Sequence, residues 1–375
     1  MPKLNDHGLG GGGGKALGVP VFPFSNNTEI FVEDLENYET FNKVYGDATG
    51  EAPVNFNSNA HCVIGDEIFI FGTSNTIAEC YKYNVKTKVW TKLSNSINTS
   101  KIDWMVPDKL NGNISIYYGE VGGTIYKYTI SSNTHTFILD TSSYHKFKNS
   151  KAVYNNAHIW TSGGNYASNQ NNLFYSFSLR TNGFTKRTNL PIGMVQHGMV
   201  SHGDSIYFFG GTAYGQRAYR YDVSTATFTQ LTNIPDPYYE GPCISDDNFI
   251  YLINSAYDSA NDNRIWIYDI VANTYTVHAE GGTNVNRSNG HAGIIDDLIY
   301  VIGGTNGPKT GYSMRLLAGK LKQALLIRLF KNTKLYTDGD VSLNDESLVK
   351  SNGVVNIPSD GEYLLVDASY ATIGG

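Results

Sequence analysis

Short apolar segments recur along this chain at regular intervals. They occupy residues 68–72, 115–119, 159–164, 206–211, 250–254 and 299–304, start 44 to 49 residues apart, and mostly end in glycine. A period of this length in β-rich units is typical of radial repeats, because one small sheet cannot bury both of its faces until others stack against it. The pattern therefore predicts an all-β propeller in which each repeat forms one blade.

Each repeat also contains other strand-like segments. A stretch of small and weakly polar residues precedes the glycine-ended one, as at 151–154 and 197–200, and small residues suit the crowded position beside a propeller axis. Two aromatic residues seven positions apart follow it, as in Tyr221 and Phe228. The Asp, Ser, Thr and Asn residues between them favour a tight turn. We therefore expect four antiparallel strands in each blade.

The last repeat lacks an outer hairpin of its own. No aromatic pair of this spacing follows Gly304, but Phe31 and Tyr38 form one near the start of the chain. We expect this N-terminal hairpin to complete the C-terminal blade, which would remove the open sheet edges. The prediction is a six-bladed propeller over residues 28–312, closed by its two ends.

These motifs resemble the kelch repeat family. In that family the second strand of a blade ends in Gly-Gly, Tyr-x-Tyr-Asp follows, and a tryptophan lies seven residues after the second tyrosine. The repeat with Gly210, Gly211 and residues 219–222 follows this pattern, with Phe228 in place of the tryptophan. Only Trp90 keeps the tryptophan, and three repeats lack the full Gly-Gly pair. The resemblance implies a kelch-type propeller whose blades vary in detail.

Both ends of the chain depart from the repeat. Residues 1–27 are rich in glycine, with two prolines near their end, and predict a flexible attachment arm. Beyond the propeller, residues 313–375 contain short apolar runs separated by Asp-Gly and Asn-Gly turns. Such runs are hairpin signals and predict a small, mostly β C-terminal domain.

The amino-acid composition argues against several classes of binding partner. The net charge of −6 with no run of Lys or Arg argues against nucleic acid or an anionic lipid surface, and no apolar run is long enough to insert into a membrane. Cys62, Cys80 and Cys243 are odd in number and lack metal-site spacing, so we expect free thiols and neither metal nor cofactor. Residues 1–17 contain no apolar signal-peptide core, so we expect synthesis in the cytoplasm without a leader.

The candidate ligand-binding face comprises the loops that enter the first strand and leave the second. Aromatic rings there could cover the apolar faces of a sugar, while charged and amide groups meet its hydroxyls. The candidates are Trp104, Tyr144, His145, His197, Tyr214, Arg217, Tyr238, Tyr239, Glu240, Arg264, Arg287 and His291, and the wider loop set includes Asp103 and Gln196. Equally, these loops could be polar only because they are exposed.

Three histidines stand at equivalent starts of the inner strand, namely His61, His197 and His291. A metal site would need all three within about 2 Å of one point. We expect equivalent positions in separate blades to lie too far apart for that. Each imidazole is instead expected to hydrogen-bond to the backbone of its own blade.

Kelch-like propellers include two enzyme classes. Galactose oxidase-like enzymes are secreted and use copper with a tyrosine linked to cysteine, and neither a signal peptide nor such a pair is evident here. Sialate mutarotase-like propellers use acidic and basic loop residues. Glu240 with Arg217, Arg264 or Arg287 could provide such a set. An enzyme of this second class acting on free sugars is therefore an alternative function.

The organisation of the whole chain resembles a phage or tailocin tail-fibre protein. The features in common are a glycine-rich arm, an Asn-, Thr-, Ser- and Tyr-rich β body and a small β tail. This resemblance implies a non-catalytic receptor-binding protein of the baseplate or virion that recognises a cell-surface glycan and is released by lysis. It would contact other tail proteins through residues 1–27 or 313–375, and self-association is left open. A further alternative is an intracellular kelch-type adaptor.

Overall fold

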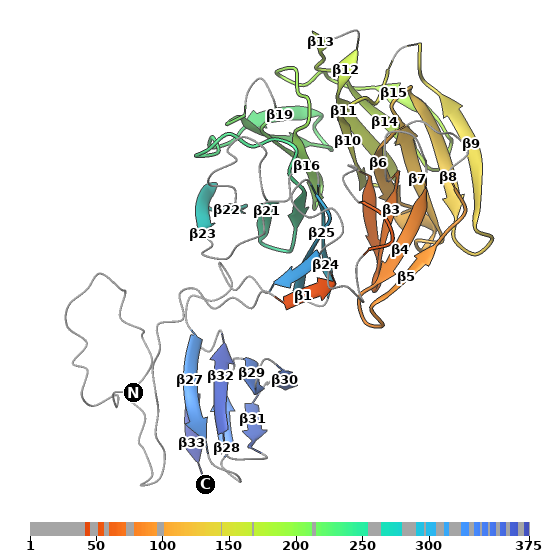
Figure 1. Cartoon of the computed structure of the whole chain (residues 1–375). Helices are drawn as coiled ribbons and strands as arrows, with labels where there is room; N and C mark the ends of the chain where they lie inside the picture. The colour runs from red at the N-terminus through yellow and green to blue at the C-terminus, as the bar shows by residue number, and fades with distance from the viewer. Residues whose placement is uncertain are drawn as a thin grey trace. The chain divides into compact units, whose positions relative to one another are not determined.

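Antiparallel β-sheets make up the fold of this chain in a computed structural model (Figure 1). The structure describes residues 42–45, 52–55, 60–72, 79–95, 101–143, 145–166, 169–211, 215–253, 264–279, 290–295, 298–304, 311–314, 324–329, 334–337, 340–343, 346–349, 353–357, 361–366 and 371–374. Within these ranges the one helical element is the 3-10 turn η1 (Lys109–Asn111), so no helix there could cross a membrane. The all-β class predicted from the sequence is confirmed.

Residues 40–315 form one compact unit that contains six four-stranded sheets. Five of these are built from strands that follow one another in chain order, with one extra hairpin inserted in blade 3. Blade 1 contains β2 (His61–Ile64), β3 (Glu67–Phe71), β4 (Cys80–Asn84) and β5 (Val89–Lys92). Blade 2 contains β6 (Ile102–Pro107), β7 (Ser115–Glu120), β8 (Thr124–Thr129) and β9 (Thr134–Asp140). Blade 3 contains β10 (Ser150–Asn155), β11 (His158–Gly163), β14 (Phe174–Ser178) and β15 (Phe184–Lys186), and a two-stranded hairpin, β12 (Asn165–Tyr166) with β13 (Asn169–Gln170), lies between β11 and β14.

The remaining two consecutive sheets follow the same order. Blade 4 contains β16 (Gly198–His202), β17 (Ser205–Phe209), β18 (Ala218–Asp222) and β19 (Thr227–Gln230). Blade 5 contains β20 (Cys243–Ser245), β21 (Phe249–Ile253), β22 (Arg264–Asp269) and β23 (Thr274–Ala279). In every case the first strand is innermost. The inner strands contact their neighbours in a closed ring of β2, β6, β10, β16, β20 and β24, which defines a propeller axis.

The sixth sheet joins the two ends of the unit. Its order is β24 (His291–Ile295), β25 (Leu298–Ile302), β26 (Gly311–Met314) and β1 (Asn42–Tyr45), so the fourth strand comes from the N-terminal side. Closure by the chain ends was expected, but the expected contribution of two N-terminal strands is wrong. Residues 31–38 lie outside the described residues, and β26 supplies the third strand. Because β26 and β1 are far apart in sequence, no seven-residue hairpin signal marks them.

Aromatic side chains fill the space between neighbouring blades. The predicted pairs face one another on adjacent strands, as in Tyr221 and Phe228, whose ring centroids are 4.8 Å apart. Phe174 of blade 3 packs edge-on against Tyr221 of blade 4, with centroids 5.0 Å apart. The repeated aromatics therefore stack blade upon blade, which explains why the period is visible in the sequence.

The two described Gly-Gly pairs in blades 3 and 4 hold each blade against the next loop. Gly164 donates its backbone N–H to the Met194 carbonyl at 3.0 Å, and Gly211 donates to the Tyr238 carbonyl at 2.8 Å. Gly210 has a φ of 69°, and a Cβ there would collide with the Tyr238 carbonyl oxygen. These positions need glycine both for the left-handed backbone and for the close approach.

A second unit includes residues 316–375, where the described residues form two small antiparallel sheets. The four-stranded sheet has the order β27 (Ala324–Leu329), β32 (Gly361–Val366), β29 (Asp340–Leu343) and β30 (Glu346–Val349). The three-stranded sheet has the order β31 (Gly353–Asn356), β28 (Lys334–Thr337) and β33 (Ala371–Gly374). Val355, Ile357 and Tyr363 are buried here. The predicted small β domain is therefore present as strands.

Candidate functional site

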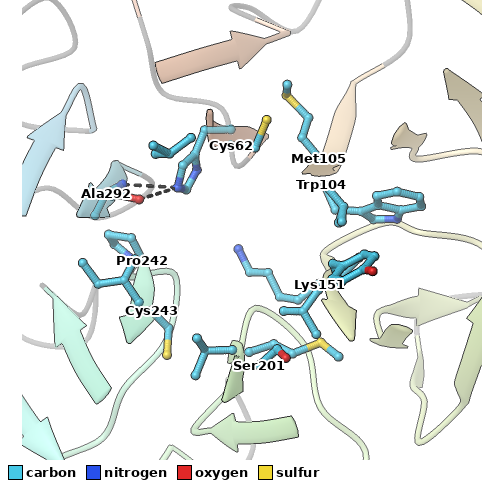
Figure 2. Close-up of a pocket in the computed structure, with 18 of the residues that line it drawn as sticks. Cys62, Trp104, Met105, Lys151, Ser201, Pro242, Cys243 and Ala292 are labelled. Atoms are coloured by element: carbon cyan, nitrogen blue, oxygen red, sulfur yellow. Dashed lines mark hydrogen bonds between the residues drawn. The ribbon is translucent and has the colours of Figure 1, made fainter. Parts of the chain in front are cut away.

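A cavity of about 350 Å³ lies among the innermost strands of all six blades. Its volume falls at the lower end of the range for small-molecule sites. Figure 2 shows labelled side chains from different blades arranged around the cavity, with Lys151 extending toward its middle. Apolar and polar groups share the wall, and the charged pair Asp103 and Lys151 lies near the starts of the inner strands. The propeller axis is thus a candidate ligand site.

Lys151 is the second residue of β10 and the central cation of this cavity. It is half-buried, and no described residue forms a hydrogen bond or ion pair with its Nζ. Burial lowers the pKa of Lys151 to about 8, and the negative charge of Asp103 only partly opposes that shift. A burial-dominated shift of this kind favours the neutral amine.

Asp103 enters the same cavity from blade 2 on a β-bulge. In the ladder between β6 and β7, Ile102 lies opposite Glu120 and Trp104 opposite Gly119, so Asp103 is the extra residue. Bulges re-aim side chains, and they are frequent beside active sites. Asp103 is 1% exposed, and its Oδ1 lies 3.7 Å from Lys101 Nζ. Burial raises the pKa of its carboxyl to about 6, although the positive charge of Lys101 opposes this.

His61 and His291 are in contact across the interface between blades 1 and 6. Their Nδ1 atoms are 3.0 Å apart, and His61 Nε2 lies 2.9 Å from the Ala292 carbonyl oxygen. The expectation that these histidines stand far apart is therefore wrong, because neighbouring inner strands are in direct contact at the axis. Burial lowers the pKa of His61 to about 4 and holds that of His291 well below its usual range, so both rings are neutral at pH 7.

His197 is also fully buried, but it binds elsewhere. Its Nε2 lies 2.8 Å from Ser162 Oγ, on strand β11 of blade 3. Burial lowers the pKa of His197 to about 3. Both His61 and His197 are thus hydrogen-bonded to a neighbouring blade rather than to their own, which corrects the expectation from the sequence. No group of three or more metal-type ligands occurs in the described part of the chain.

Three further candidates that the structure describes are buried side chains. Trp104 lines the cavity but is 2% exposed and packs edge-on against Phe147 at 5.1 Å. His145 is fully buried beside Tyr175, at a ring distance of 4.8 Å. Tyr238 is buried and donates its hydroxyl to the Pro242 carbonyl at 2.8 Å. These three side chains pack inside the protein rather than on an exposed loop face.

The loop residues before the inner strands and after the second strands differ in how far they are exposed. Glu240 accepts a hydrogen bond from Gln196, Tyr239 is partly exposed and Arg217 is exposed. Arg264 begins strand β22, whereas Tyr144, Tyr214 and Arg287 lie outside the described residues. The face predicted from the sequence therefore stays a prediction. Lys151 was not among its candidates, although a lysine among the small residues of an inner strand is a signal that could have identified it.

Comparisons with known proteins define the fold class. No protein-family model and no curated protein matches the chain. Among solved structures, that of YjhT is similar to this chain with a TM-score of 0.55 and 15% sequence identity, over 75% of this chain and 96% of YjhT. At that identity the similarity concerns the fold alone. The protein has a kelch-type β-propeller fold, as the repeats predicted.

This similarity also corrects a functional prediction. The expectation that the protein is not an enzyme does not hold as stated, because the propeller fold that the chain shares with YjhT gives no ground for excluding catalysis. Tail-fibre organisation receives no support from the similarity. Attachment through residues 1–27 or 313–375, recognition of a surface glycan, self-association and release by lysis stay predictions.

Proposed function

We propose that the protein is a kelch-type propeller enzyme that catalyses proton transfer on a free sugar, in the manner of a mutarotase. The reaction would take place in the axial cavity, near the end where the inner strands begin. The observation that carries the proposal is the joint presence of Asp103 and Lys151 in one small cavity. Their pKa values of about 6 and about 8 lie on either side of neutral pH. An acid and a base with pKa values near the working pH are the groups that general acid–base catalysis requires.

Each residue has a defined role in this proposal. At pH 7 the Asp103 carboxylate accepts the proton of the anomeric hydroxyl, while the Lys151 ammonium donates a proton to the ring oxygen. The bond between the anomeric carbon and that oxygen breaks, and the open-chain carbonyl forms. Reclosure on the other face of the carbonyl, with the two proton transfers reversed, yields the other anomer. No proton is gained or lost overall.

The surroundings support this division of roles. Asp103 is carried by the β-bulge, and its buried carboxyl oxygens have no hydrogen-bond partner among the described residues, so they can accept a hydrogen bond from a ligand. His61, which lines the cavity, and its neighbour His291 are neutral at pH 7, so neither ring adds a charge beside the proposed pair. A preorganised, poorly solvated cavity strengthens the electrostatic interactions of a bound sugar.

The test is two-dimensional NMR exchange spectroscopy on reducing sugars. A neutral hexose and an acidic sugar would be supplied at anomeric equilibrium, and the α-to-β exchange rate would be measured with and without the full-length protein. We expect catalysed exchange for at least one of them. Asp103→Asn and Lys151→Met should each lower the catalysed rate by about 100-fold or more, the usual contribution of one general acid or base.

Lys109→Gln is the matched control. Lys109 also lines the cavity, but it is exposed on η1 and lies beyond the last residue of β6. Its loss should leave the exchange rate unchanged. An exchange rate that survives in both the Asp103 and Lys151 variants, with unchanged circular dichroism, would remove the proposed acid–base pair.

A further inference from the structure

The charge of the Lys151 amine acts on titratable groups from all the other blades. Besides Asp103 of blade 2, its charge shifts the pKa values of His61 in blade 1, His197 beside blade 4, Cys243 in blade 5 and His291 in blade 6. Groups so spread around the ring can share one neighbour only if that neighbour lies near the axis. The amine therefore stands close to the centre of the cavity, as Figure 2 shows.

Lys151 differs from several other described lysines in its lack of a close acceptor. Lys82 lies 2.6 Å from Glu67, Lys92 lies 2.7 Å from Glu79, and Lys127 lies 3.7 Å from Asp108. A carboxylate at such distances stabilises the ammonium form. Lys151 has no ion-pair partner of this kind among the described residues, and Lys101, not Lys151, is the lysine closest to Asp103.

The carboxylates of Asp103 and Glu240 oppose the loss of the Lys151 proton, but neither forms an ion pair with its Nζ, and the other described groups around it carry no negative charge. The three histidines are neutral at pH 7, and burial raises the pKa values of Cys62 and Cys243 far above neutral, so both thiols keep their protons. The remaining wall includes Val63 and Met199. A desolvated lysine in such surroundings is an amine nucleophile, and this is the usual way that proteins activate lysine toward carbonyl compounds.

We propose that Lys151 forms an imine with small carbonyl compounds, such as short aldehydes and α-oxo acids, that enter the axial cavity. The Nζ lone pair adds to the carbonyl carbon, and a proton moves from nitrogen to oxygen to give a carbinolamine. Loss of the hydroxyl as water leaves the imine, so one carbonyl and one amine yield one imine and one water. Asp103, which lines the same cavity, would in its protonated form donate the proton that leaves with the hydroxyl. This reaction requires no sugar turnover.

The expected selectivity follows from the free-amine fraction. A lysine whose pKa falls from 10.5 to about 8 has about 300-fold more neutral amine at pH 7. Part of this advantage is lost because nucleophilicity falls with basicity and because the cavity restricts entry. We therefore expect Lys151 to react at least 10-fold faster than an exposed lysine.

The experiment is reductive trapping on the unmodified full-length protein. Glyoxylate and sodium cyanoborohydride would be added at pH 7, and the extent of modification at each lysine would be followed by peptide mass spectrometry. Lys109, exposed on η1 and also lining the cavity, and Lys88, exposed in a hairpin turn, are the internal comparisons. We expect Lys151 to be labelled first and the difference to shrink at pH 10, where exposed amines also lose their protons.

Two results would overturn the proposal. One is labelling of Lys151 no faster than that of Lys88, and the other is preferential labelling that persists after the protein is unfolded in urea. Because the measurement uses no variant, it does not depend on a mutant folding. It is also separate from the sugar assay: an adduct at Lys151 without anomer exchange would support the amine site and refute the mutarotase proposal.

Discussion

Neutral histidines buried in the propeller make its stability depend on pH. His145 is the clearest case, because it is fully buried, packs against Tyr175 and has no hydrogen-bond partner on either ring nitrogen among the described residues. Burial lowers its pKa from 6.5 to about 3. Since the folded pKa lies below the unfolded one, the stability that His145 contributes is complete above pH 6.5 and decreases as the pH falls toward 3.

Replacing this ring with an apolar one should remove that dependence. We expect His145→Phe to be at least as stable as the parent at pH 7.5 and to lose about 2 kcal/mol less between pH 6.5 and pH 5, as a pKa difference acting over 1.5 pH units implies. Urea unfolding of both proteins at pH 7.5, 6.5 and 5 measures the free energies of unfolding that test this expectation. His158→Phe is the control, since His158 is only partly buried and hydrogen-bonds to the Asn156 carbonyl at 2.7 Å. Parallel pH curves for the parent and His145→Phe would contradict the prediction.

The proposed acid–base pair predicts its own pH profile. Asp103 must be ionised to act as the base, so the catalysed anomer exchange should rise with pH through about 6. Lys151 must be protonated to act as the acid, so the rate should decline through about 8. The rate constant measured across pH 5 to 9 should therefore describe a bell with its maximum near 7. A profile that is flat across that range would exclude this pair.

At the scale of the strand, the glycine pairs decide how one blade meets the next. Gly210 passes so close to the Tyr238 carbonyl that a side chain would collide with backbone, whereas Gly65, also with a positive φ, has no atom within 4 Å of a Cβ. Two glycines with similar backbone conformations therefore carry different constraints. Gly65 is required by its backbone conformation alone, whereas Gly210 is required by close packing as well.

This contrast gives a paired stability test. Gly65→Ala should destabilise the protein by about 1 kcal/mol, the cost of a left-handed residue other than glycine. Gly210→Ala should cost about 3 kcal/mol or more, because the loop carrying Tyr238 must also move. Thermal and urea unfolding of the two variants measure the difference. Equal losses would mean that the interface between blades 4 and 5 adapts freely.

The same scale shows what the sequence could and could not predict. Second strands and aromatic hairpins were predictable, because each relies on a local period such as that of Tyr221 and Phe228. The axial cluster was less predictable, since Asp103 depends on a bulge and Lys151 on the meeting of strands from separate repeats. Buried candidates such as His145 and Tyr238 were placed on a loop face because loop sequences alone do not reveal burial.

At the scale of the whole propeller, one pairing closes the ring. Asn42 lies opposite Ser313 and Lys43 opposite Tyr312, on strands β1 and β26. All other outer strands described here follow their neighbours in the chain. The seam in blade 6 is thus the place where a propeller of this order can open without breaking a hairpin.

Covalent closure of that seam should stabilise the fold. The double variant Asn42→Cys with Ser313→Cys should form a disulfide, since the two residues are direct partners across antiparallel strands. We expect the oxidised form to exceed the reduced form in stability by about 2–4 kcal/mol, as judged by urea unfolding with and without dithiothreitol. The single variants control for each substitution. Identical midpoints in the oxidised and reduced forms would show that the seam is not where unfolding begins.

The strand β1 also imposes an order on events during synthesis. It leaves the ribosome before the other described strands of the propeller, yet its partner β26 is the last of these to be made. Blades 1 to 5 can form one after another as the chain emerges, since each is complete in itself. The N-terminal strand must wait for residue 314 to clear the exit tunnel. Until then the nascent protein is an open arc whose axial cavity is incomplete, so the amine of Lys151 meets its full set of neighbours only once the ring is closed.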